Sequence, residues 1–209
     1  MKTRILIIIL LAVSFLRCPA QHPPVLKIDS IIAPLVLDKH WLYHPGDDTT
    51  WSSMDFDDHQ WDTISTILNL TNKDESFFPG IAWFRLHFEI DSSLRNNAFV
   101  LLLQQQGASE IFLNGILITN AGKVGSNENE EETNNPASLP RQIQFSDTTK
   151  YVLAIRYSNQ KAWRYYEAYN ESEAGFTLQI SMLDIASTIM RYEVLSSYFI
   201  FFLFMVFLV

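Results

Sequence analysis

The segment from Gly80 to Ile118 constrains the fold of this chain more than any other part of the sequence. Between Phe84 and Ile90, apolar residues occupy every second position and polar residues lie between them. Side chains of a strand point alternately to opposite faces, so this pattern predicts a strand with one buried face and one solvated face. Further along, Asn114 and Gly115 separate two short apolar runs, and Asn-Gly adopts positive φ at little cost. The segment therefore predicts antiparallel strands joined by a two-residue hairpin turn.

Three other segments also read as strands. The run Ala98–Gln105 is almost continuously apolar, which is typical of a strand buried on both faces, whereas Tyr151–Tyr157 and Phe176–Met182 alternate again. Irregular connections, without amphipathic helices, separate these runs. We therefore predict an all-β fold, a jelly-roll β-sandwich of seven or eight strands over residues 38–183, with residues 21–37 as an extended lead-in.

The connections carry most of the aromatic and acidic residues outside the strands. Residues 51–61 place three aromatic residues among turn formers, and we expect this segment to fold over one end of the sandwich with its rings in the core. Residues 122–140 are polar and predict a long solvated loop. Residues 163–169 predict an aromatic loop before the last strand.

The N-terminal residues 1–20 are typical of a secretory signal peptide. Lys2 and Arg4 precede an apolar run, and Cys18 and Ala20 place small residues at the −3 and −1 positions of a cleavage site before Gln21. A lipoprotein signal using Cys18 is the alternative. The chain has one cysteine, so the exported part would contain no disulfide and its stability would rest on burial.

The C-terminal residues contain a long apolar run. No charged residue occurs from Val194 to Val209, and sixteen helical residues would span roughly 24 Å of a hydrocarbon core of roughly 30 Å. We predict that residues 184–209 form a helix, capped by Asp184, that enters a membrane through residues 194–209. A buried C-terminal helix or strand is the alternative. Residues 21–192 would then lie on the periplasmic or extracellular side of a bacterial cell membrane.

The charge balance restricts the classes of binding partner. The chain has a formal net charge of −8 at pH 7. Phosphate backbones and anionic lipid headgroups repel an acidic surface, so the sequence predicts that this chain binds neither nucleic acid nor the surface of an anionic membrane.

Several motifs resemble a known family. They are WLYHPGDDTTW (41–51), FDDHQW (56–61), GIAWFRLHFEI (80–90), GASEIFLNG (107–115) and YVLAIRYSN (151–159). Together they resemble the galactose-binding-like jelly roll, and the domain is similar to the sugar-binding domain at the front of β-galactosidase-type glycoside hydrolases.

The form that this chain most resembles precedes a membrane region in bacterial signalling proteins, among them sensor histidine kinases, seven-helix sensors and membrane-bound phosphatases. This resemblance implies the ligand-sensing extracytoplasmic domain of a membrane-anchored signal transducer. The alternative is a membrane-tethered carbohydrate-binding or accessory module of a glycoside hydrolase.

The sequence contains no motif of an enzyme active site, and we predict neither catalytic residues nor a cofactor. The aromatic segment is the candidate ligand site, because sugars stack on exposed rings while polar groups hold their hydroxyls. Its candidate residues are Trp163, Arg164, Tyr165, Tyr166, Glu167 and Tyr169. The alternatives are that these rings close the sandwich near the membrane or pack against a second protomer in a homodimer.

The acidic residues Asp55, Asp57 and Asp58 are weak candidates for a calcium site, since hard oxygen ligands close in sequence suit that ion. The simpler interpretation is a turn in which carboxylates accept hydrogen bonds from nearby backbone N–H groups. His40 and His44 lie four residues apart in a predicted strand, where this spacing does not bring them together on a metal.

Overall fold

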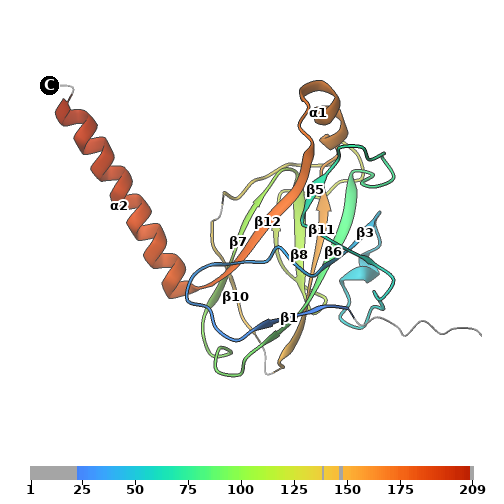
Figure 1. The fold of residues 1–209 in the computed structure, drawn as a ribbon, viewed down its shortest axis with the longest axis horizontal. Coiled ribbons are helices and arrows are strands. Elements are labelled where there is room, and N and C mark those ends of the chain that lie inside the picture. The colour runs from blue at the N-terminus through green and yellow to red at the C-terminus, as the bar shows by residue number, and fades with distance from the viewer. Residues whose placement is uncertain (1–22, 138, 146–147, 208–209) are drawn as a thin grey trace, which may run out of the picture.

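The structure is a computed structural model that describes residues 23–137, 139–145 and 148–207, with side chains as far as Phe201. The described residues form a β-sandwich with a short helix, α1, at one end and a long helix, α2, that projects away from it (Figure 1). The predicted signal peptide, residues 1–20, lies outside the described residues. The predicted all-β sandwich is confirmed.

One sheet has seven strands. In spatial order these are β4 (Asp62–Ile64), β3 (Trp41–Pro45), β6 (Ile81–Ile90), β11 (Lys150–Ser158), β8 (Ala108–Leu113) and β9 (Ile116–Ala121), with β1 (Val25–Ile28) also beside β6. All neighbours are antiparallel except β1 and β6. The predicted hairpin joins β8 to β9, and Asn114 and Gly115 have φ values of 50° and 83°. The turn is therefore of the kind that Asn-Gly favours.

The second sheet has five strands. They are β10 (Arg141–Ile143), β7 (Phe99–Gln105), β12 (Glu173–Met182) and β2 (Leu35–Val36) in spatial order, with β5 (Ile67–Asn69) also beside β12. The long pairing is that of β7 with β12, in which Phe176 lies opposite Gln105 and Met182 opposite Phe99. Gln105 therefore marks one end of this pairing, and Met182, which precedes the long helix, marks the other.

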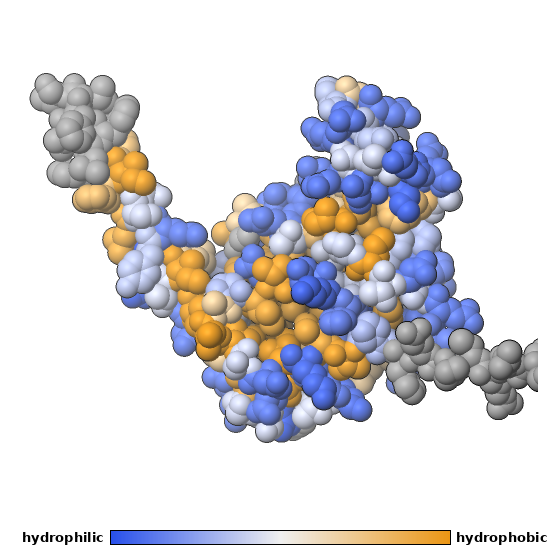
Figure 2. All heavy atoms as spheres, in the orientation of Figure 1, coloured by the Kyte–Doolittle hydropathy of each residue, from blue (hydrophilic) through white to orange (hydrophobic). Residues whose placement is uncertain are grey.

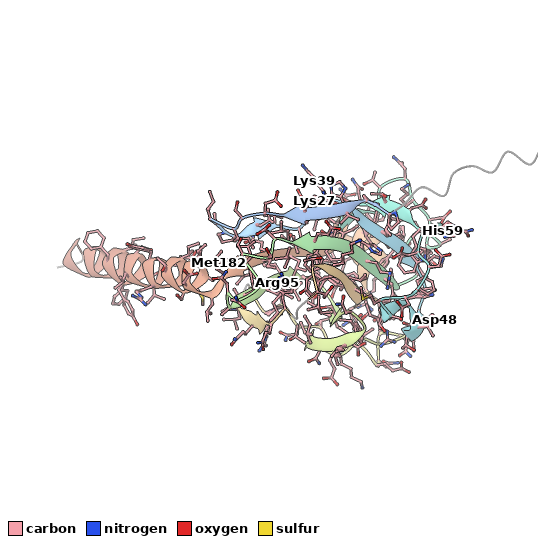
Figure 3. The ribbon with its side chains drawn as sticks, turned by 90° about the horizontal axis from the view of Figure 1, so that it is seen from below. Lys27, Lys39, Asp48, His59, Arg95 and Met182 are labelled. Atoms are coloured by element: carbon pink, nitrogen blue, oxygen red, sulfur yellow. The ribbon has the colours of Figure 1, made fainter. Side chains whose placement is uncertain are left out.

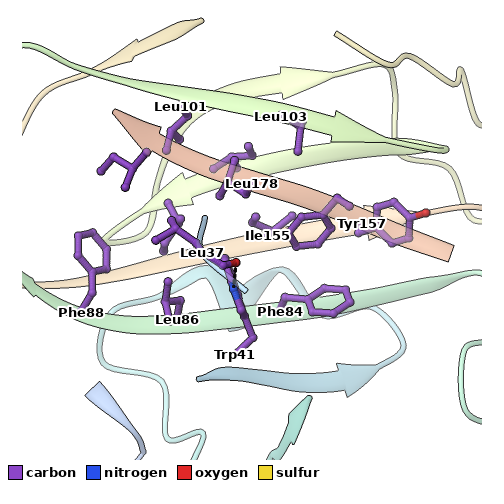
Figure 4. Packing of buried hydrophobic residues seen from close by; sticks show 14 of the residues in the cluster. Leu37, Trp41, Phe84, Leu86, Phe88, Leu101, Leu103, Ile155, Tyr157 and Leu178 are labelled. Atoms are coloured by element: carbon purple, nitrogen blue, oxygen red, sulfur yellow. Dashed lines mark hydrogen bonds between the residues drawn. The ribbon is translucent and has the colours of Figure 1, made fainter. Parts of the chain in front are cut away.

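The core lies between the sheets and follows from the alternation in β6. Phe84, Leu86 and Phe88 point inward and are buried against side chains of the other sheet (Figure 4). The ring of Trp41 meets that of Phe176 edge to face at 5.7 Å between centroids, which is the geometry that aromatic pairs prefer. Its indole Nε1 donates to the carbonyl of Leu37 at 2.8 Å, so the one polar atom of this buried ring is satisfied.

The sandwich begins earlier in the chain than residue 38. Within the predicted lead-in, β1 pairs with β6 and β2 pairs with β12. Ile28, Ile31 and Leu37 are buried in the core, whereas Ile32 is exposed. Pro34 stands just before β2, a two-residue strand at the sheet edge, where proline is tolerated.

The outer face of β6 is not solvated as predicted. Arg85 is fully buried because the segment between β3 and β4, which includes the 3-10 helix η1 (Thr49–Ser52), covers this face. The rings of Trp51, Phe56 and Trp61 pack there. The ring centre of Trp51 lies 6.4 Å from that of Trp83, which points outward from the sheet. The prediction that these rings enter the sandwich core is therefore wrong. They pack instead on the outer face of β6, the face to which the alternation in that strand assigns Trp83 and Arg85.

The predicted aromatic loop is a helix, α1 (Ala162–Tyr169). Trp163 and Tyr166 are three residues apart and Tyr165 and Tyr169 four apart, which places each pair on one side of a helix. The helix ends at Asn170, which adopts the left-handed conformation (φ 57°) that Asn tolerates at this position. The loop prediction failed because no capping side chain marks the start of so short a helix.

The polar segment 122–140 is tied down at several points. The backbones of Lys123 and Glu132 form an isolated antiparallel β-bridge within the segment, and the Glu131 carboxylate accepts a hydrogen bond from the backbone N–H of Gln160. Glu128 pairs with Arg164 of α1 at 2.7 Å. The segment therefore lies against α1 and forms one wall of a hollow described below.

The helix α2 (Leu183–Phe207) follows β12 without an intervening residue. Figure 3 shows Met182 at the base of α2, whereas Asp48 and His59 lie at the far end of the sandwich. We predicted a membrane-spanning helix over residues 194–209, but among the described helices none combines the length and the apolar character that crossing a membrane requires. The helices α1 and α2 lie at opposite ends of β12, so the rings of α1 do not lie beside the C-terminal helix, as one of the alternatives required.

Candidate ligand-binding site

A polar hollow of about 330 Å³ lies beside α1, where the end of β7 meets the segment 122–140. Side chains with amide groups dominate its lining: Gln105, Gln106, Asn134, Asn135 and Asn159. Gly107, Thr133, Lys161, Tyr165 and Glu171 complete it. The surface around α1 is also mostly hydrophilic, as Figure 2 shows.

Gln105 forms the floor of this hollow and is held rigidly. Its Nε2 donates to the carbonyls of Gly107, Ala121 and Asn134, the last at 2.9 Å, and its backbone N–H donates to Asn135 Oδ1. These contacts fix which end of the amide carries the nitrogen. The buried Oε1 has no hydrogen-bond donor within the described part of the chain.

Gly107 allows the β7–β8 connection to lie close to β11. Its φ is +102°, and a Cβ at this position would stand 2.0 Å from the carbonyl oxygen of Ser158. Any side chain would therefore both strain the backbone and push the connection away from β11. The close approach brings Gln106 and Asn159 to the same hollow.

Of the six predicted site residues, Tyr165 lines the hollow. Arg164 lies beside it, with its guanidinium 5.7 Å from the centre of the Tyr165 ring. Trp163 instead donates its indole N–H to the carbonyl of Phe78 at 2.7 Å and, with Tyr166, packs on the hydrophobic core. The structure thus uses one side of α1 to anchor the helix and presents another to the hollow.

Glu167 and Tyr169 are exposed on α1. Tyr169 is 70% exposed, and its ring centre lies 6.0 Å from that of Tyr165. Neither residue lines the hollow, so Tyr169 offers a matched comparison with Tyr165 below.

The sequence did not indicate the amide residues of the hollow. Gln105 and Gln106 close a strand and Asn134 and Asn135 lie in a polar segment, where amide side chains are common. The available signal was the change from leucine to glutamine at the end of β7, where the apolar run of the strand stops.

The acidic cluster is distributed over separate contacts. Asp57 pairs with His59 at the surface, while Asp58 is buried and accepts hydrogen bonds from Arg85 Nε at 2.6 Å and His87 Nε2 at 2.7 Å. Asp55 is exposed. Within the described ranges, no group of three or more His, Cys, Asp and Glu side chains is placed to hold a metal ion.

The buried carboxylate of Asp58 fastens the covering segment to the sheet. Burial raises its pKa, but the hydrogen bonds and charges of His87 and Arg85 outweigh burial and hold the pKa of Asp58 below its ordinary value. Arg85 also donates to the carbonyls of Trp51 and Ser53. This cluster is a structural anchor, on the face of the sheet remote from the core.

The lining of the hollow is suited to hydrogen bonding. Amide groups both donate and accept, which matches the hydroxyl groups of a polyol. Glu171 adds a carboxylate, which accepts hydrogen bonds, to this lining.

The model of a known family, the beta-galactosidase second all-beta domain, matches residues 46–162. This chain belongs to that family. The matched residues include most strands of the seven-stranded sheet and β7, together with part of the lining of the hollow. The domain is thus a galactose-binding-like sandwich related to glycoside hydrolases, as the motifs predicted.

Solved structures with this fold come from glycoside hydrolases. A family 2 glycosyl hydrolase of Bacteroides cellulosilyticus superposes with a TM-score of 0.51 at 19% identity, over 71% of this chain and 21% of the other. A β-glucuronidase of Bacteroides uniformis gives 0.52 at 16% identity, over 70% and 18%. A β-glycosidase of Bacteroides vulgatus gives 0.50 at 22% identity, over 71% and 20%.

At these identities the likeness establishes the fold of the β-galactosidase-type domain. The chain spans about a fifth of the length of these hydrolases. A comparison with curated protein sequences gave no match.

Proposed function

We propose that this β-galactosidase-type domain is a non-catalytic carbohydrate-binding module, an accessory domain of the glycoside hydrolase kind, and that its sugar binds in the hollow beside α1. The polar hollow carries this proposal. Its volume of about 330 Å³ lies near the lower bound of roughly 300 Å³ for small-molecule sites. Membership of the family supports the class of ligand.

The lining supplies what sugar recognition requires. Gln106 and Asn134 can accept from and donate to hydroxyls at once, Asn135 can donate through its Nδ2 while its Oδ1 accepts two backbone N–H groups, and Lys161 and Glu171 add one donor and one acceptor. Tyr165 adds an aromatic ring at the wall, against which the C–H face of a pyranose can pack. Because the contacts of Gln105 hold the floor in place, binding would require little reorganisation.

Replacing Tyr165 by alanine tests this assignment. We expect the affinity of the full chain for a glycan selected on a glycan array to fall about tenfold or more, corresponding to about 1.4 kcal/mol. The matched control is Tyr169→Ala on the same helix, which we expect to bind within about twofold of the original chain. Isothermal titration calorimetry measures both. Equal losses in the two variants, or glycan binding that neither affects, would place the site elsewhere.

A second function is favoured by the junction between β12 and α2. The strand β12 begins two residues after Glu171, which lines the hollow, and its last residue, Met182, is followed at once by α2. Leu183 donates its N–H to the carbonyl of Ala98, which fastens the first turn of α2 to the sheet. We propose that a shift of β12 on ligand binding moves α2, so that the domain acts as the input domain of a bacterial signal transducer.

A flexible Gly/Ser insertion between Met182 and Asp184 of the full protein tests the transducer. Binding should persist, and the response of the protein to its ligand should be lost. An unchanged response would exclude rigid coupling.

In this role residues 21–192 lie outside a bacterial cell membrane. The exported protein should then begin at Gln21, as measured by N-terminal mass spectrometry. An intact residue 1 would contradict export.

A further inference from the structure

A second hollow adjoins the first at the end of β7. It has a volume of about 210 Å³ and lies along β5 and the start of β12. Gln105, Gln106 and Asn135 line both hollows, so these side chains stand at their boundary. Ile67, Gln104 and Thr177 line the second hollow and not the first.

We infer that the two hollows form one binding groove for at least two consecutive sugar units of a neutral oligosaccharide. The inference rests on the proposed function and specifies its ligand. The second hollow alone is smaller than the roughly 300 Å³ of an independent small-molecule site, and it shares three lining residues with the first. It is therefore an extension that receives the next unit of a chain whose first unit lies beside Tyr165.

The second hollow has the mixed lining that a sugar unit requires. Gln104 and Thr177 offer donors and acceptors from neighbouring strands, in which they lie directly opposite each other. Ile67, which is 38% exposed, offers apolar surface for C–H groups. Gln104 is exposed, so its amide group is accessible to a ligand hydroxyl.

Charge along the groove selects a neutral glycan. Lys161 and Glu171 in the first hollow offset each other, and Glu173 is the charged residue in the lining of the second. A uronic acid or a sulfated unit in the second hollow would face a carboxylate with no cation beside it in the lining. Since exposed charges interact within a Debye length of about 8 Å at physiological salt, this repulsion acts on a ligand seated in the hollow.

The experiment measures affinity against chain length. The full chain is titrated with glucose, galactose, mannose and xylose and with their homodisaccharides and homotrisaccharides, and with the homodisaccharide of glucuronate as the charged probe. We expect a neutral disaccharide to bind at least about tenfold more tightly than its monosaccharide, and we expect the glucuronate disaccharide to bind more weakly than the glucose disaccharide. Gln104→Ala should remove most of the gain with length and leave monosaccharide affinity unchanged. Gln142→Ala, an exposed glutamine of β10 outside both hollows, is the control and should keep the gain.

Each outcome decides between the two proposals. Monosaccharide binding that depends on Tyr165 but shows no gain with length would overturn the extended groove and leave the proposed function standing. A gain that survives Gln104→Ala would also overturn it, because the second unit would then lie elsewhere. Equal binding of the glucuronate and glucose disaccharides would overturn the selection for neutral sugars. Absence of binding by every glycan on the array and in the series would overturn the proposed function itself.

Discussion

Replacing Arg85 by methionine is expected to lower the free energy of unfolding by about 3–5 kcal/mol. Arg85 is fully buried, and its guanidinium bonds to Asp58 and to two backbone carbonyls of the covering segment. Its removal leaves the buried carboxylate of Asp58 with His87 as its remaining partner in the cluster, and leaves the segment with fewer bonds to the sheet. Chemical denaturation of the full chain, followed by tryptophan fluorescence, measures the difference.

Two comparisons separate the buried charge from a general effect of losing arginine. Arg164→Met removes an exposed ion pair with Glu128 and should cost less than about 1 kcal/mol. The pKa of Asp58 is held low in the folded chain, so its contribution is present above the carboxyl pKa of the unfolded chain, about 3.9, and is lost as pH falls through the folded value. The deficit of Arg85→Met should accordingly shrink below about pH 4; a deficit independent of pH would contradict this explanation.

Replacing Gly107 by alanine is expected to destabilise the sandwich by about 3 kcal/mol or more. The positive φ contributes about 1–3 kcal/mol of strain, and the new Cβ would contribute about 1–3 kcal/mol more by displacing the β7–β8 connection from Ser158. For a chain of this size, the melting temperature should fall by about 6–12 °C, as measured by circular dichroism.

Gly115→Ala is the matched control for Gly107→Ala. Gly115 also has a positive φ, +83°, but the nearest atoms to its Cβ position stand 3.6 Å away, at ordinary contact distance. This variant therefore carries the backbone strain without the collision, and we expect it to lose about 1–2 kcal/mol. If both variants lost the same stability, the close approach of Gly107 to Ser158 would contribute nothing.

The inward face of the sandwich was predictable because burial imposes a strict period of two. The alternation in β6, β11 and β12 predicts strands from a few adjacent residues, and the Asn-Gly pair predicts a hairpin turn in the same way. The outer face of β6 was not predictable by the same rule. Arg85 has the polarity of a solvated residue, and its burial depends on contacts with Asp58 and Trp51, which lie about thirty residues away in the chain.

The candidate site was partly predictable. Aromatic composition indicated residues 163–169, but it did not distinguish Tyr165, which lines the hollow, from Trp163, which anchors α1 to the core. That distinction depends on which side of a short helix meets the sheets. The amide residues come from three separate segments that only the folded chain brings together, so no local sequence pattern indicates them.

The placement of the two helices at opposite ends of β12 has a practical consequence. A ten-residue strand is roughly 33 Å long, so the groove lies far from the point where α2 leaves the sheet. A surface coupled to the C-terminal helix would hold the protein with its open end toward the bulk solution, so biosensor immobilisation through that helix should leave glycan access unhindered, whereas random amine coupling would engage Lys161 at the rim.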